Sequence, residues 1–275
     1  MRELPLPTLP LSDLLAPAAH RRSLHPSSQS PRLEVAWARD EADVRAAQRL
    51  RHAVFADEMG ARLNLPLGAP PGHDIDMFDP FCEHLLVCAP TGADGEPGEV
   101  IGTYRVLTPA AARRVGGLYS DTEFDLTRLR PLRARLVELG RSCVHPDWRA
   151  GGVILALWGA LGEFMQRNGL ETMIGCASVG TRDGGHVAAS LWQQLRQTHL
   201  APIEWQVRPR LALPVEDLRS DLVVEPPALI KGYLRCGAQL LGPPAWDPDF
   251  NTADLPLMMR LAELPARYRR HFLAA

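Results

Sequence analysis

LVELGRSCVHPDWRAGGVILALWGALG, residues Leu136–Gly162, is the stretch of the chain that decides the fold. Its aliphatic first part predicts a buried strand at Arg135–Val144. The prolines and glycines that follow predict a turn, and the apolar residues from about Gly152 to Arg167 predict a helix. We therefore expect a central strand that leads through a glycine-bearing turn into a helix.

The charged and polar residues of this stretch suggest chemistry. Glu138 and Arg141 stand among aliphatic neighbours, where ionised side chains are seldom placed unless something there needs them. The turn Pro146–Gly152 directs free backbone N–H groups toward a helix N-terminus, which is a favourable site for an anion. An acid or base beside a phosphate cradle indicates group transfer from a carrier with a phosphate-bearing arm.

The segments on either side predict an α+β domain on one mixed, mostly antiparallel sheet flanked by helices. We expect residues 1–32 to be a mobile Pro/Ser-rich leader, residues 33–210 the main domain, and residues 211–275 a C-terminal extension packed on it. Further strands are predicted at Leu33–Trp37, Glu83–Ala89, Glu99–Leu107, Glu171–Ser178, Ile203–Val207 and Ala238–Leu241. Further helices are predicted at Glu41–Glu58, Gly185–Gln197 and Pro226–Leu234.

The composition argues against several classes of protein. The net charge of -2 argues against bulk binding of nucleic acid. The five cysteines are dispersed without a CxxC pair or a Cys/His cluster at metal spacing, which fits reduced thiols and predicts no metal site. No apolar run approaches the ~20 residues of a membrane span, and prolines with Asp13 interrupt any N-terminal signal sequence. We expect a cytoplasmic protein.

Short motifs follow one another along the chain in a definite order. They are Val54-Phe55, Asp74–Val87, Gly102–Arg105, Glu138–Arg149, Leu157–Leu161, Gly175–Ser178, His199–Pro202, Pro227–Ala238 and Asp249–Asp254. With the order of elements, this set resembles the GNAT acyltransferase superfamily. Within it, the chain is similar to acyl-homoserine-lactone synthases and, more closely, to the ornithine N-acyltransferases of ornithine-lipid synthesis. Each motif alone is weak, whereas the ordered set is specific.

This resemblance implies an N-acyltransferase that moves a 3-hydroxyacyl group from acyl carrier protein to the α-amine of L-ornithine, giving lyso-ornithine lipid. It implies no metal or redox cofactor, because the donor is carried on the phosphopantetheine arm of acyl carrier protein. Ile154 stands where coenzyme A enzymes of the superfamily usually have Gly or Ala, which favours a carrier-borne donor. Three alternatives stay open: an acyl-homoserine-lactone synthase, an N-acyltransferase of another amino acid, and a degenerate domain that only binds carrier protein or membrane.

Acyl transfer to an amine needs a base, because only the free amine attacks a thioester. Glu138 lies on the central strand, where the superfamily commonly places its glutamate, so it is the first candidate. A salt bridge with Arg141 or Arg105 is the structural alternative, and Glu58 is the second candidate base. Arg141 would face away from Glu138 in a regular strand, and a bulge would bring both into one catalytic cleft.

Other charged residues are candidates for binding the amino acid. We expect Arg105 to bind the ornithine carboxylate through its planar guanidinium, with a structural role as the alternative. Asp76, or else Glu58, is expected to hold the side-chain ammonium group, with Asp74 in the same acidic group. Loop capping is the alternative for both aspartates.

A helix face and the glycine turn complete the expected site. Arg51 and Phe55 lie one helical turn apart and, by resemblance, line the cleft, although Phe55 suits a place in the core. Arg149, Gly151 and Gly152 are expected to hold the phosphate of the pantetheine arm.

A run of arginines is a candidate docking surface. Acyl carrier proteins are acidic, so a basic face could bind them, and a solvated face is the alternative. The C-terminal run Arg267–Leu273 mixes cations with aromatic residues, which suggests a peripheral contact with the inner membrane. The arginines of the basic face are Arg113, Arg114, Arg128, Arg130, Arg133 and Arg135.

Overall fold

Eight strands form the central sheet, in the order β1-β2-β3-β5-β6-β10-β8, with β9 also paired to β10. The computed structural model describes residues 33–91, 98–149 and 152–272, so the predicted leader lies outside the described residues. β5 and β6 run parallel and the other pairs of this sheet are antiparallel. The α+β prediction is therefore confirmed. The strands are β1 Glu34–Trp37, β2 Glu83–Cys88, β3 Val100–Leu107, β5 Leu136–Val144, β6 Thr172–Gly180, β8 Gln239–Leu240, β9 Ala245–Asp247 and β10 Thr252–Arg260; β4 Phe124–Asp125 pairs separately with β7 Arg208–Pro209.

Helices flank this sheet, as predicted. Asp40 caps the first of them, because its side chain accepts a hydrogen bond from the Asp43 N–H. That helix was expected to reach Glu58; its last turn, Ala53–Glu58, is a π-helix. In the described part of the chain, no helix combines the length and apolarity needed to cross a membrane. The α-helices are α1 Glu41–His52, α2 Pro109–Val115, α3 Ser120–Glu123, α4 Val153–Arg167, α5 His186–His199, α6 Ala228–Arg235 and α7 Ala266–Phe272.

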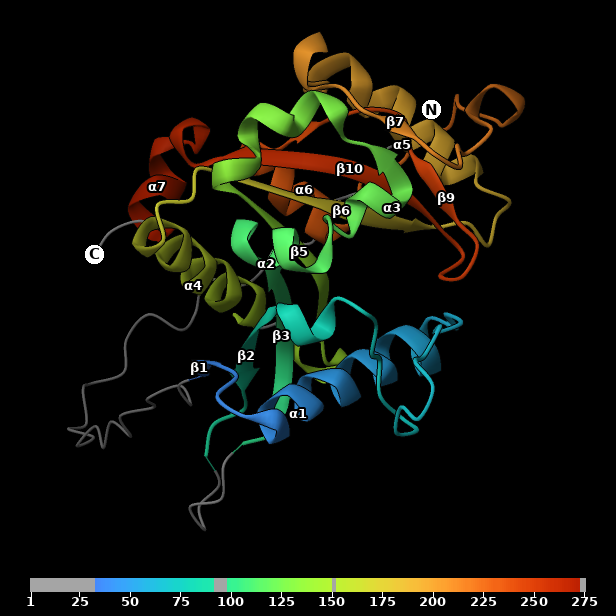
Figure 1. Cartoon of the computed structure of the whole chain (residues 1–275). Helices are drawn as coiled ribbons and strands as arrows, with labels where there is room; N and C mark the ends of the chain where they lie inside the picture. Colours follow the sequence, from blue (N-terminus) through green and yellow to red (C-terminus); the bar gives the residue numbers. More distant parts are fainter. Residues whose placement is uncertain (1–32, 92–97, 150–151, 273–275) are drawn as a thin grey trace, which may run out of the picture. The chain divides into compact units, whose positions relative to one another are not determined.

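Helices α1 and α4 cover opposite faces of the sheet (Figure 1). Successive side chains of a strand point to opposite faces, and β3 shows the consequence. Val100 packs in a cluster with Leu50 of α1, whereas Ile101 packs in another cluster with Leu157 of α4. The sheet is thus buried on both sides next to its central strand.

The central strands β5 and β6 separate partway along their length. They pair over Leu136–Glu138 and no further. A Cβ added at Gly175 would lie 2.4 Å from the backbone oxygen of Leu139, so this glycine lets the strands pass closely where they begin to diverge. Beyond that point β5 carries a bulge opposite Thr103–Arg105, with Arg141 at a φ of 49°. The bulge considered from the sequence is therefore present.

Two C-terminal segments differ from the sequence expectation or extend it. Ile203–Val207 was predicted as a strand, and this was wrong, because Ile203–Trp205 is a 3₁₀ helix closed by a hydrogen bond from the Trp205 N–H to the Pro202 carbonyl. Ile203 is 65% exposed, so its apolar character does not report burial in a sheet. The predicted extension 211–275 contributes β8, β9 and β10 to the central sheet, and β10 pairs with β6 along its whole length.

Candidate active site

A cavity of about 620 Å³ lies where β5 and β6 separate. Its walls come from both strands and from α4 and α6, and most of the residues that line it are apolar. On the helical side Trp158 stacks on Tyr233, with ring centroids 5.3 Å apart. A cavity of this size and character suits a small-molecule ligand with an apolar part.

Glu138 lies in the wall of this cavity and is only 4% exposed. Its Oε2 accepts a hydrogen bond from the Tyr119 N–H at 2.6 Å, and its Oε1 accepts from the Ser120 N–H at 2.7 Å and the Ser120 hydroxyl at 2.5 Å. These partners replace the salt bridge with Arg141 or Arg105 that was the structural alternative. Burial raises the pKa of the Glu138 carboxyl, and the hydrogen bonds from Ser120 and Tyr119 oppose part of that rise. A carboxylate has about four acceptor positions, so Glu138 retains one.

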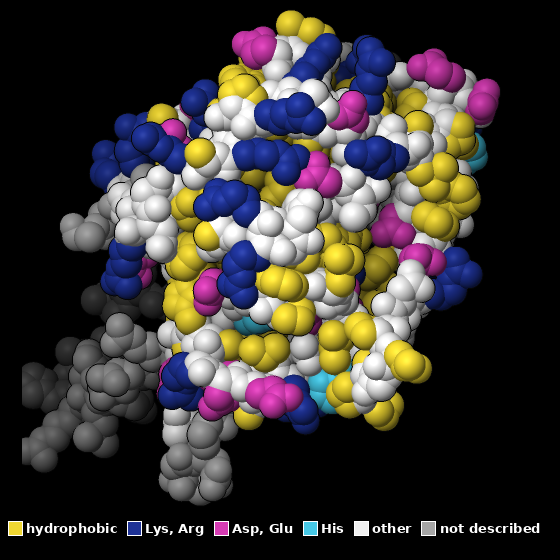
Figure 2. Space-filling view, viewed as in Figure 1, with side chains coloured by type: hydrophobic (Ala, Val, Ile, Leu, Met, Phe, Trp, Pro, Cys, Tyr) yellow, Lys and Arg dark blue, Asp and Glu magenta, His cyan; other side chains and the backbone are white. Residues whose placement is uncertain are grey.

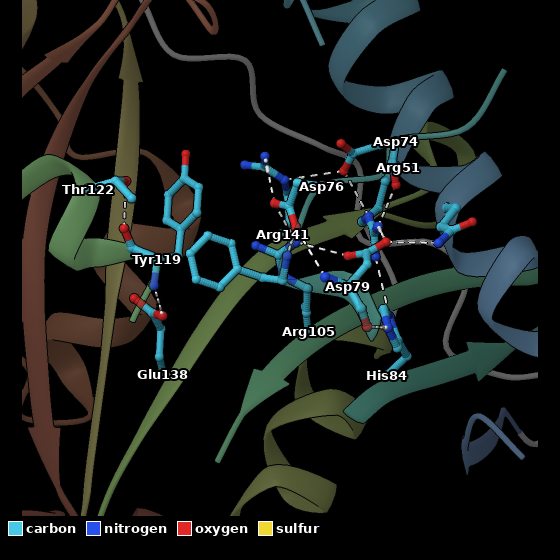
Figure 3. A network of polar contacts seen from close by, with 12 residues as sticks. Arg51, Asp74, Asp76, Asp79, His84, Arg105, Tyr119, Thr122, Glu138 and Arg141 are labelled. Carbon is cyan, nitrogen blue, oxygen red and sulfur yellow. Dashed lines mark hydrogen bonds and ion pairs between the residues drawn. The ribbon is translucent and has the colours of Figure 1, made fainter. Parts of the chain in front are cut away.

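Asp79 is the centre of a buried ionic network beside the cavity (Figure 3). Its Oδ2 lies 2.5 Å from Nη2 of Arg51, and its Oδ1 lies 2.9 Å from Nη1 of Arg105. The Gln48 amide donates to the same carboxylate, and Nε2 of His84 lies 3.2 Å from the Asp79 carbonyl oxygen. Burial alone would raise the pKa of Asp79, but the Arg51 and Arg105 charges outweigh it and hold that pKa below its usual value.

Asp74 and Asp76 extend the same network toward β5. Oδ2 of Asp74 lies 2.9 Å from Nε of Arg51 and 3.2 Å from Nε of Arg141. Oδ2 of Asp76 lies 2.6 Å from Nη1 of Arg105, and its Oδ1 accepts the Phe78 N–H, so it also caps its own loop. The three aspartates are thus matched by three arginines.

This matching corrects the roles predicted for the acidic loop. Asp76 was expected to hold an ammonium group, with Asp74 in the same acidic group, but arginines from α1, β3 and β5 already neutralise both aspartates. Arg51 was expected to line the cleft, but its side chain is 0% exposed and is not part of the cavity wall. Arg105 does reach the wall, with its guanidinium tied to Asp76 and Asp79.

Arg141 and Phe55 take the places in the cavity wall that the sequence suggested. The guanidinium of Arg141 lies between two rings, 5.1 Å from the centroid of Tyr119 and 4.6 Å from that of Phe250. The ring of Phe55 packs edge-on against Phe250, so Phe55 belongs both to the core and to the wall. The bulge therefore brings Arg141 and Glu138 to one cavity.

Glu58 lies outside the cavity wall and forms an ion pair with Arg149. Both of its carboxylate oxygens accept hydrogen bonds from Arg149, at 2.7 and 2.6 Å. This bidentate contact lowers the pKa of Glu58, and the side chain does not line the cavity. The structure does not bring Glu58 together with Glu138, and its role as a base stays a prediction.

The glycine turn is described only in part. Gly151 lies outside the described residues, whereas Gly152 is the N-cap residue of α4. Arg149 and Ile154 both line the cavity, so the position that departs from the usual GNAT pattern contributes to its wall. Burial raises the pKa of the nearby Cys143 thiol to about 12, which leaves it protonated and a poor nucleophile.

A second acidic cluster at the cavity wall has no counterpart among the residues predicted from the sequence. Glu123 at the end of α3 and Asp254 in β10 have their carboxylates within 4.8 Å of each other and of the Cys176 sulfur. Asp254 closes the motif Asp249–Asp254, which was the one available signal. Glu123 gave none, because α3 is a short polar turn without a pattern of its own.

Comparison with known sequences gives consistent results. A family described as "Acetyltransferase (GNAT) domain" matches residues 50–159. An L-ornithine N(alpha)-acyltransferase of Rhodobacter capsulatus is 37% identical over 258 residues, which cover 87% of this chain and 94% of the relative. One of Agrobacterium fabrum is 36% identical over 253 residues, covering 87% and 85%.

A solved structure shares the fold at much lower identity. FeeM, an N-acyl amino acid synthase from uncultured soil microbes, superposes with a TM-score of 0.51 at 10% identity, covering 87% of this chain and 99% of that one. The acyl-homoserine-lactone synthase LasI gives a TM-score of 0.48 at 15% identity, covering 88% and 95%. The GNAT-like architecture expected from the sequence is confirmed.

Proposed function

Because the chain belongs to the family of L-ornithine N(alpha)-acyltransferases, we propose that it transfers a 3-hydroxyacyl group from acyl carrier protein to the α-amine of L-ornithine. The product is then lyso-ornithine lipid. The observation that supports this reaction best is the apolar cavity that carries Glu138 and Arg141 in one wall. An acyl chain needs such a cavity, and an acceptor ammonium needs a carboxylate there.

The reaction follows from what the wall offers. Glu138 takes a proton from the ammonium group of the acceptor, and the freed nitrogen attacks the thioester carbonyl carbon. Negative charge then builds on the thioester oxygen, which the Arg141 guanidinium in the cavity wall can stabilise. When the C–S bond breaks, the nitrogen loses a second proton as the amide forms, the leaving thiolate takes up that proton, and Glu138 then releases the first proton to solvent.

Arg105 has a structural role beside Arg141 in the cavity wall. Its side chain is 4% exposed, against 13% for Arg141, and it holds both Asp76 and Asp79. Those aspartates in turn contact Arg51 and Arg141. We therefore infer that Arg105 holds the Asp74–Asp79 loop in position and that Arg141 contacts the substrate.

Two features favour acyl carrier protein over free coenzyme A as donor. Ile154 places a bulky side chain where a small residue usually lets the backbone approach a nucleotide pyrophosphate. Figure 2 shows basic side chains gathered over α2 and the 3₁₀ helix Thr127–Arg135, and most of the arginines predicted for the basic face are exposed. Such a face is complementary to an acidic carrier. The proposed reaction needs no cofactor other than the phosphopantetheine arm.

The expected contact with the inner membrane and the cytoplasmic location stay predictions. The C-terminal run that suggested a membrane contact forms the helix α7. Arg269 of this helix donates to the carbonyl oxygens of Ala262 and Leu264, so part of its cationic charge faces the protein.

The donor and acceptor are tested together with purified protein and product mass spectrometry. We expect 3-hydroxyacyl carrier protein and ornithine to give the N(alpha)-acyl product, with kcat/KM at least tenfold above that for the coenzyme A thioester. Lysine, glutamine and S-adenosylmethionine serve as competing acceptors. No product with ornithine, or a lactone from S-adenosylmethionine, would overturn the proposal.

Glu58→Gln separates the two candidate bases. We expect kcat at saturating donor to stay within about twofold of the wild type, because Glu58 binds Arg149 and its pKa is lowered. Loss of this half-exposed ion pair should cost less than about 1 kcal/mol in stability. Steady-state kinetics and a melting curve measure both. A fall in kcat of a hundredfold or more, without loss of fold, would restore Glu58 as the base.

A further inference from the structure

The second acidic cluster differs from the first in lacking cations. Among the described residues, no arginine or lysine forms an ion pair with Glu123 or Asp254, whereas Asp74, Asp76 and Asp79 all have arginine partners. Both carboxylate oxygens of Glu123 are buried, and the side chains of Cys176, Tyr119 and Asp254 are its hydrogen-bonding neighbours. Asp254 is 4% exposed and accepts a hydrogen bond from the Thr252 hydroxyl.

Ionised carboxylates that are buried without a nearby cation are unfavourable, and burial therefore raises the pKa of both groups. Burial, with the neighbouring Asp254 charge, raises the pKa of Glu123 to about 8. Burial, with the nearby Asp247 charge, also raises the pKa of Asp254. The groups that face the pair are Asp247, Cys176, Tyr119, Ser178 and Thr252.

The cluster also lies at the substrate cavity and close to Glu138. Asp254 and Cys176 line the main cavity, and Glu123 lines an adjoining one that shares Tyr119, Arg141 and Phe250 with it. The Ser120 hydroxyl donates to Glu138 and lies 3.6 Å from the Cys176 sulfur. Ser120 and Cys176 therefore link the candidate base to the second acidic cluster.

We propose that Glu123 and Asp254 bind the side-chain ammonium group of a diamino acid acceptor while its α-amine faces Glu138. This assignment rests on the proposed function. An ammonium group has three donors, and two carboxylates together have about eight acceptor positions, more than their present neighbours fill. The bound ammonium group then supplies the positive charge that the two carboxylates lack among their neighbours.

An ammonium group fits the cluster better than a metal ion does. A metal would need the Cys176 thiol as thiolate. Burial and the neighbouring carboxylates raise the pKa of that thiol well above its usual value. If the thiol stays protonated, it is not a metal ligand, and the two carboxylates can accept hydrogen bonds from an ammonium group.

The test compares ornithine with norvaline, which has the same carbon chain without the side-chain amine. Wild-type protein should prefer ornithine, and Glu123→Gln should lower kcat/KM for ornithine by about 10- to 100-fold, mainly through KM, with little change for norvaline. Asp254→Asn should do the same. Asp125→Asn removes an exposed charge two residues from Glu123 and should leave the preference unchanged.

Binding measured by calorimetry without donor makes the test independent of acyl transfer. We expect ornithine to bind wild-type protein more tightly than norvaline, and Glu123→Gln to abolish the difference. Equal binding by wild-type protein, an unchanged preference in the variant, or a preference lost on adding a chelator would each overturn the assignment. Failure of the proposed function would look different, since wild-type protein would then acylate neither amino acid.

Discussion

Glu138→Gln is expected to lower kcat for acyl transfer by about 10²- to 10⁴-fold, the usual contribution of a positioned base. The glutamine keeps the size of the side chain but cannot take a proton from the acceptor ammonium. Wild-type kcat should also fall toward acid, at a pH above the ordinary range of a glutamate because burial raises the pKa of Glu138. The variant should lack this acid limb. Steady-state kinetics across pH, with a melting curve for each protein, measures both effects.

Ser120→Ala is the matched control for this variant. The Ser120 hydroxyl donates to Glu138 and thereby lowers its pKa, so its removal should move the acid limb to higher pH and leave the plateau of kcat nearly unchanged. If Glu138 only holds the start of α3, its glutamine variant should lose stability without losing turnover per folded molecule. Full turnover in a folded Glu138→Gln protein would exclude Glu138 as the base. Loss of acyl transfer in the Glu138→Gln variant, with folding and carrier binding kept, would exclude the alternative of a degenerate domain.

Arg51→Met is expected to lower the free energy of unfolding by about 3–5 kcal/mol. Arg51 is 0% exposed and binds both Asp74 and Asp79, so its loss leaves buried carboxylates short of a cation. Urea unfolding at neutral pH measures the effect. The wild-type advantage should shrink as pH falls through the carboxyl range, because the depressed pKa of Asp79 stabilises the fold only while that group is ionised.

Arg45→Met on the same helix is the control. Arg45 pairs with Glu41 on the surface, with 52% of its side chain exposed, so its removal should cost less than about 1 kcal/mol. Similar losses for the two variants would show that the buried network contributes no more than a surface pair. The buried ion pairs would then no longer account for the fixed position of the Asp74–Asp79 loop.

The sequence predicted most elements near the site because their signals are local. α4 buries Val153, Leu157, Leu161 and Met165, four residues apart each time, and this spacing is visible in the chain itself. The strand β5 and its possible bulge were likewise visible as an aliphatic run with two charges. The prediction of a strand at Ile203–Val207 was wrong because an apolar run beside a proline is compatible with a turn as well as with a strand.

The partners of the charged residues were much less predictable. Asp76 and Glu58 were predicted to be free to bind an ammonium group, as members of one acidic group. In the structure, Asp76 forms an ion pair with Arg105, and Glu58 forms one with Arg149. Glu123 and Asp254 lie 131 positions apart in sequence and were not connected by any pattern. They meet because β10 pairs with β6 and the short helix α3 ends beside both strands.

The sequence by itself determined the order of elements and the position of Glu138 on the central strand, and its ordered motifs carried the resemblance to a class of acyltransferases. Periodicity, caps and turns act over neighbouring residues, so they can be inferred without coordinates. Only the tertiary structure decided which carboxylates are neutralised and which remain without a cation. That outcome depends on burial and on distances of a few ångströms between remote segments, and the strength of each charge interaction changes steeply with both.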